Sequence, residues 1–60
     1  MYKLTALIND STIFCGVHYS LKECEETAGH MYQFMHESMN IIHTTFIAEK
    51  DNECVYVWIY

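Results

Sequence analysis

A single segment of this chain, residues 21–39, has the apolar periodicity of an amphipathic helix. At helical spacing its apolar side chains fall within one arc, and they are Leu21, Cys24, Ala28, Met31, Tyr32, Met35 and Met39. Ser20 and Glu23 fit a capping box at its start, and Met39-Asn40 ends it. Since the chain has only 60 residues and one such segment, its helix can cover only one face of a sheet.

The segments on both sides of this helix have the alternation of β-strands. Residues 2–8 alternate, and the turn formers at 9–12 lead into a second apolar segment at 13–19, which predicts a hairpin. Residues 41–48 are rich in β-branched and aromatic side chains, and a polar turn at 49–53 leads into the alternating residues 54–60. The sequence therefore predicts a single α+β domain over residues 1–60, with the order ββαββ and one amphipathic helix packed on one face of a four-stranded sheet.

The alternation also predicts which side chains face the helix. The expected inward residues of the sheet are Leu4, Ala6, Ile8, Cys15, Val17, Val55, Val57 and Ile59. Their expected partners on the helix are Leu21, Cys24, Ala28, Met31 and Met35. The third strand leaves two choices open, because either Ile42 with Phe46 or Ile41 with Ile47 satisfies the alternation.

Strand order follows from two general rules. The second and third strands should run parallel, with the helix as a right-handed crossover between them. The last strand is so apolar that an open edge would expose it to aggregation. We therefore expect it in a central position beside the first strand.

Charge and cysteine content limit the partners and the compartment. Three lysines and no arginine oppose eight acidic residues, for a net charge of -5, which argues against direct binding of nucleic acid. The same acidity, and the lack of an apolar run of about 20 residues, argue against a membrane partner. An odd count of three cysteines with no signal-peptide pattern favours free thiols and a cytoplasmic location.

The cysteines and histidines do not have the spacing of a metal or catalytic site. Cys15 and His18 are three residues apart on a strand, so their side chains diverge. His30 and His36 lack the three- or four-residue spacing that aligns ligands on a helix. A cysteine nucleophile also needs a neighbouring base and positive surroundings, which this acidic chain offers poorly. We therefore expect no catalytic residue, no metal and no cofactor.

The excess of apolar residues predicts an interaction surface. The chain is 52% hydrophobic, more than a 60-residue core can bury, and exposed apolar surface on a small domain usually meets a partner. With the inward residues given above, the sheet face away from the helix displays Leu7, Phe14, His18, Tyr56, Trp58 and Tyr60. Four of these are the expected apolar anchors, namely Phe14, Tyr56, Trp58 and Tyr60. The anchored partner is either another protein or, in a symmetric homodimer, a second copy.

The polar arc of the helix is a second candidate surface. Glu25, Glu26 and Glu37 lie on it with Glu23, and only Lys22 balances them. These carboxylates would steer a basic partner toward the helix. The alternative is an ordinary solvated helix face.

This chain resembles the small early proteins of T-even-like phages. The resemblance is in its length, its acidity, its use of lysine without arginine, and its richness in Ile, Met and Tyr. Within that group it is similar to the discriminator-of-mRNA-degradation antitoxin family. The features that carry this similarity are an extended N-terminal segment, a central helix and the stretches 45–50 and 54–57. The resemblance implies a phage-encoded protein in the host cytoplasm that binds a host toxin ribonuclease and blocks its active region. We therefore expect a non-catalytic inhibitor acting by occlusion, with a self-associating structural subunit as the alternative.

Overall fold

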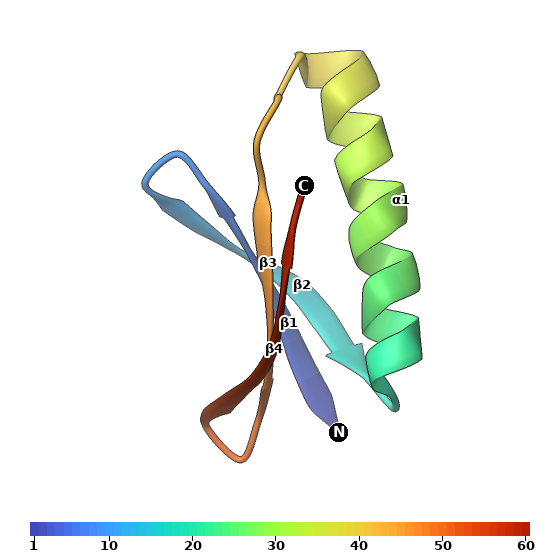
Figure 1. The fold of residues 1–60 in the computed structure, drawn as a ribbon, viewed down its shortest axis with the longest axis vertical. Coiled ribbons are helices and arrows are strands. Elements are labelled where there is room, and N and C mark those ends of the chain that lie inside the picture. Colours follow the sequence, from blue (N-terminus) through green and yellow to red (C-terminus); the bar gives the residue numbers. More distant parts are fainter.

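The computed structural model describes residues 1–60 and has the predicted order of elements. These elements are β1 (Tyr2–Ile8), β2 (Ser11–His18), α1 (Leu21–Met39), β3 (Thr45–Lys50) and β4 (Glu53–Ile59). The strands form one four-stranded antiparallel sheet, and α1 lies along one side of it (Figure 1). The predicted α+β fold class is confirmed.

The strand order is β2-β1-β3-β4, with every neighbouring pair antiparallel. Because β2 and β3 both pair with β1, they run parallel to one another, as expected, and α1 connects them. The expected central position of the last strand is wrong, since β3 lies beside β1 and β4 forms an edge. The central place belongs to the strand that carries Phe46 and Ala48, both fully buried.

Tight turns join the strands of each hairpin. In the β3–β4 turn, Asp51 and Asn52 have φ values of 54° and 65°. Positive φ at both central residues is what a type I′ hairpin turn requires, and Asp and Asn tolerate it better than most residues. This turn holds β4 beside β3, and because β3 pairs with β1 on its other side, β4 lies at the edge of the sheet.

The two ends of α1 are capped as the sequence predicts. The Ser20 hydroxyl accepts the Glu23 N–H at 3.1 Å, and the Glu23 carboxylate accepts the Tyr19 N–H at 2.9 Å. At the other end Asn40 has a left-handed φ of 56°, and the Ile41 N–H donates to the Met35 carbonyl at 3.3 Å. The helix α1 lacks the apolar length that crossing a membrane requires.

The core is a thin layer between α1 and the sheet. Its buried apolar residues are Leu4, Ala6, Ile8, Cys15, Cys24, Ala28, Met35, Phe46 and Ala48. Seven of these were expected, and Phe46 and Ala48 come from β3, whose inward set the sequence left open. Ala6, Ala28 and Ala48 are fully buried, so small side chains bring the helix and the middle of the sheet close together.

The expected inward set of β4 is wrong. Val55 and Val57 are each 42% exposed and Ile59 is 81% exposed. The register pairs Trp58 with Phe46 and therefore places the alternate residues of β4 on the helix side. Trp58 and Tyr60 pack against the core from this side.

Other strand residues also differ from expectation. Val17 is 49% exposed rather than inward, and His18 pairs with Tyr2, on the helix side of the sheet. In β3 the inward pair is Phe46 with Ala48, which matches neither choice in full, because Ile42 is 58% exposed and precedes the strand. Gly16, with a φ of 98°, lies at a register shift between β1 and β2, and that irregularity interrupts the simple alternation from which Val17 was predicted.

Candidate functional site: the α1–β4 groove

A groove runs between the first half of α1 and the edge strand β4. It consists of two adjoining hollows of about 230 and 450 Å³ that share Lys22 and Glu25. We call it the α1–β4 groove, and its lining residues are Leu21, Lys22, Glu25, Glu26, Gly29, His30, Tyr56, Trp58 and Tyr60.

Local structure explains why these side chains meet. On α1 the lining residues recur three or four positions apart, from Lys22 through Glu25 and Glu26 to Gly29, which places them on one side of the helix. On the strand side, Tyr56 and Trp58 are two residues apart, so they project from the same face of β4. The groove is therefore the flank at which a helix face and the edge of a sheet converge.

Aromatic contacts fix the floor of the groove. The rings of Tyr56 and Trp58 have centroids 4.8 Å apart with an interplanar angle of 58°. Tyr60 meets Phe46 edge-to-face at 5.7 Å and stacks on Tyr32 at 5.1 Å. Trp58 and Tyr60 also pack against the core, whereas Tyr56 is 52% exposed. Two rings are thus held in place by the core, and the third is available to a partner.

The backbone of β4 adds a second kind of binding group. The strand pairs with β3 on one side only, because it is the last strand of the sheet. An edge strand presents a row of N–H and C=O groups that another extended chain can pair with. The groove and this row belong to the same strand, so one ligand can use both.

The charges of the groove favour a cationic ligand. Glu25 and Glu26 contribute two carboxylates against the single ammonium of Lys22. A Lys or Arg side chain placed here would have a carboxylate close to it and an aromatic face, such as that of Tyr56, beneath it. The arrangement is suited to binding an extended, positively charged segment of another protein.

Five of the seven predicted partner-binding residues come together in this groove. The aromatic residues and the glutamates were predicted to lie on two opposite surfaces, and the structure instead joins Tyr56, Trp58 and Tyr60 with Glu25 and Glu26.

The other two predicted residues lie elsewhere. Phe14 is 61% exposed and pairs with Thr5 on the sheet face away from α1, and Glu37 is exposed near the end of the helix. Gly29 and His30 also line the groove and were not among the predicted binding residues, although their helical spacing from Glu25 and Glu26 was a usable signal.

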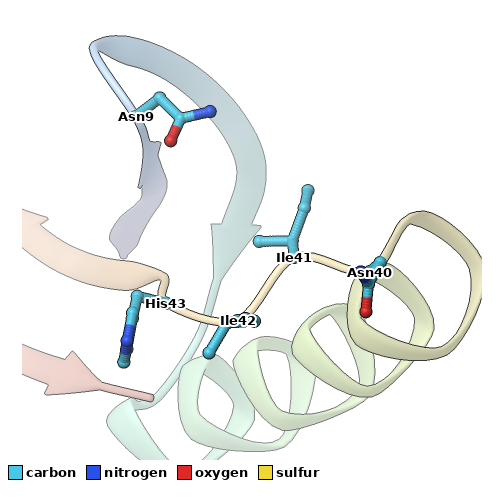
Figure 2. A pocket seen from close by; sticks show the side chains of 5 residues that line it. All are labelled: Asn9, Asn40, Ile41, Ile42 and His43. Atoms are coloured by element: carbon cyan, nitrogen blue, oxygen red, sulfur yellow. The ribbon is translucent and has the colours of Figure 1, made fainter.

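A third hollow, of about 270 Å³, lies between the β1–β2 turn and the segment that follows α1 (Figure 2). Its lining residues are Asn9, Asn40, Ile41, Ile42 and His43. Asn9 reaches it from the turn and the other four come from the end of the helix and the connection to β3. No cluster of three or more His, Cys, Asp or Glu side chains is arranged to hold a metal ion here or elsewhere in the chain.

The three cysteines are free, with Cys15 and Cys24 buried and Cys54 exposed. Burial raises the pKa of the Cys15 thiol above its ordinary value. Burial, reinforced by the negative charge of Glu23, also raises the pKa of the Cys24 thiol. Both buried thiols therefore stay protonated at neutral pH and act as small apolar core residues.

Comparison of this chain with known protein families, curated proteins and solved structures found no match.

Proposed function

We propose that this chain is a small, non-catalytic binding protein that inhibits a larger partner protein by covering part of its surface. The observation that carries the proposal is the α1–β4 groove, in which aromatic rings, carboxylates and an open strand edge adjoin one another. These three features match one kind of ligand, a protein segment in extended conformation with Lys or Arg side chains.

The aromatic composition of the groove supports this proposal. Trp and Tyr are the residues most enriched among those that dominate binding energy at protein interfaces. Tyr56 offers a half-exposed ring, and the neighbouring Trp58 ring is already packed on the core, so little side-chain entropy is lost when a partner binds.

The acidic balance of the chain supports the same partner chemistry. A net charge of -5 draws a positively charged partner toward the molecule, and the glutamates of α1 concentrate that charge beside the groove. The association rate should therefore fall as salt concentration rises.

The resemblance to the antitoxin family gives the proposal its most specific form. In that form the chain is phage-encoded, acts in the host cytoplasm and neutralises a toxin ribonuclease, whose substrate-binding surface is basic because it must hold RNA. Covering such a surface requires no chemistry from the inhibitor itself.

The test begins with capture of a protein from host lysate on the immobilised chain and its identification by mass. The dissociation constant is then measured for the purified partner with the wild type, Tyr56→Ala and the double variant Glu25→Lys/Glu26→Lys. We expect Tyr56→Ala to cost about 2 kcal/mol of binding free energy, or roughly 30-fold in affinity. The double charge reversal should weaken binding at least about tenfold and reduce its salt dependence.

Glu37→Lys is the matched control, since it reverses a carboxylate on the same helix outside the groove. It should change affinity by less than about threefold, because a distant exposed charge contributes little. Glu25, Glu26 and Glu37 are surface positions of the helix, so their substitution should leave the fold intact. Circular dichroism spectra and urea midpoints that match those of the wild type will verify this for every variant. A partner that binds the groove variants as tightly as it binds wild type would contradict the proposed site.

A further inference from the structure

The face of the sheet away from α1, which we call the outer face, carries no covering element (Figure 1). The strand registers arrange its side chains in three rows that each cross all four strands. In the order β2, β1, β3, β4, the rows are Phe14, Thr5, Ile47, Val57; Thr12, Leu7, Thr45, Ile59; and Val17, Lys3, Glu49, Cys54.

Apolar side chains dominate the outer face and are open to solvent. The exposed fractions are 61% for Phe14, 42% for Val57 and 81% for Ile59. Leu7 and Val17 are 37% and 49% exposed. A contiguous apolar surface of this kind on a small domain marks a contact with another macromolecule.

The outer face is also the electrically neutral part of an acidic molecule. Its only charged side chains, Lys3 and Glu49, lie opposite one another on neighbouring strands. The other acidic residues lie on α1, in the two turns and at the end of the β3–β4 hairpin. Two copies of a chain with a net charge of -5 repel one another least where they meet through this face.

From this arrangement we infer that the outer face binds a second copy of the chain, giving a homodimer of two stacked sheets with the helices outside. The row pattern is self-complementary about a twofold axis that runs parallel to the strands between β1 and β3. That rotation places β1 over the second copy's β3, and β2 over the second copy's β4.

The side chains match under this operation. Lys3 comes to lie over the second copy's Glu49, so the single charge pair of each face meets its opposite. Phe14 lies over the second copy's Val57, which fills the corner between the edge strands of the two sheets. Aligned face-to-face packing of two sheets is a common arrangement, with the sheets about 10 Å apart.

The small size of the outer face indicates a weak dimer. Strands about 4.8 Å apart and rows about 6.7 Å apart give the twelve positions a flat area of about 400 Å² per copy, and the side chains standing on it add to this. A standard interface buries about 800 Å² per partner, and the flat area is about half of that, which is the size of a weak, transient contact. We expect a dissociation constant in the micromolar range.

Sedimentation velocity over about 1 to 200 µM protein tests the inference, because a dimer's population depends on concentration. The wild type should shift toward a species of twice 7.1 kDa as concentration rises. Phe14→Lys should weaken the dimer by at least about 30-fold. Lys3→Glu should weaken it by placing two carboxylates opposite one another, and the added change Glu49→Lys should restore it.

Phe34→Lys is the matched control, because Phe34 is 64% exposed on α1 while Phe14 is 61% exposed on the outer face. This control should dimerise like the wild type. A wild type that stays monomeric throughout the range overturns the inference and leaves the face to a different protein. A dimer that survives Phe14→Lys, or is lost in Phe34→Lys, also overturns it. None of these variants alters the α1–β4 groove, so the outcome is independent of partner binding.

Discussion

Trp58 lies opposite Phe46 in the register of β3 and β4, and this pairing turns its ring toward the helix. Phe46 is fully buried, and Trp58 packs against the same core cluster from the edge strand. The tryptophan is thus both part of the fold and part of the floor of the groove. Tyr56, its neighbour at 4.8 Å, is the more exposed of the two and the better probe of binding.

Trp58→Ala should lower the free energy of unfolding by about 2 to 3 kcal/mol, because it removes a large, partly buried ring next to the core. Ile59→Ala, one residue away but 81% exposed, should change it by less than about 0.5 kcal/mol. Urea unfolding at low protein concentration, where the chain is monomeric, measures both. A larger loss for Ile59→Ala than for Trp58→Ala would mean that the register of β4 is shifted by one residue, because such a shift exchanges the two faces of the strand.

Ser20→Ala should destabilise the protein by about 1 kcal/mol, because the Ser20 hydroxyl accepts the Glu23 N–H at the start of α1. Ser38→Ala removes the same hydroxyl near the end of the helix and should be neutral or slightly stabilising, since alanine is the better helix former. Thermal unfolding followed by circular dichroism measures both variants. A loss that is as large in Ser38→Ala would argue against the cap.

Replacing each of the two glycines with alanine should change the free energy of unfolding in opposite directions. Gly16 has a φ of 98°, and an added Cβ would lie 3.2 Å from the His18 ring, so Gly16→Ala should cost about 1 to 2 kcal/mol. At Gly29 an added Cβ would lie 3.8 Å from the Tyr60 hydroxyl, which is an ordinary contact. Gly29→Ala should therefore gain about 0.5 to 1 kcal/mol through helix propensity. The urea midpoints of the two variants, compared with that of the wild type, show whether each substitution destabilises or stabilises the protein. A midpoint that rises in Gly16→Ala or falls in Gly29→Ala would contradict the prediction.

Thiol labelling at neutral pH should modify Cys54 well before Cys15 and Cys24. Cys54 is exposed, while burial both shields the other two and raises the pKa of each thiol. Time-resolved labelling with a disulfide reagent, followed by mass spectrometry of the intact chain, should show one fast and two slow additions. Cys54→Ser should remove the fast step alone.

Stability should decline in alkaline solution for the same reason. The folded state raises the pKa of Cys15 and Cys24 above their ordinary value of 9.0, so the unfolded chain loses these protons first. The stabilisation is complete below about pH 9 and is lost as pH rises through the folded values. Urea unfolding from about pH 8 to 10.5 should show a smaller decline in Cys15→Ala/Cys24→Ala than in the wild type. Equal slopes would mean that the two thiols do not contribute.

Local features of the fold were predictable because they depend on neighbours in the sequence. The bounds of α1 follow from Ser20, Glu23 and Asn40, whose capping bonds span three to six residues. The inward set of β1, Leu4, Ala6 and Ile8, follows from the alternation of the strand.

For the candidate binding site, the types of residue were predictable from the sequence, but the positions of those residues in the fold were less so. Aromatic and acidic residues were expected to bind a partner, and the structure gathers most of them in the α1–β4 groove. Phe14 was expected on the same sheet face as Tyr56, but the two lie on opposite sides of the sheet, because Tyr56 pairs with Ala48 on the helix side. Alternation alone offers two equivalent faces for β4, and both Val57 and Trp58 are apolar enough to be buried.

The helix, its amphipathic character, the strands and the order of these elements could be predicted from the amino-acid sequence, because each depends on residues close together in the chain. The tertiary structure alone decided which face of β4 meets the helix and which strand lies at the centre. Those choices depend on the fit between distant residues, in which Ala6, Ala28 and Ala48 draw the helix onto the middle of the sheet. The larger rings are left to fill the flank, and the aliphatic side chains of β4 are left on the outer face.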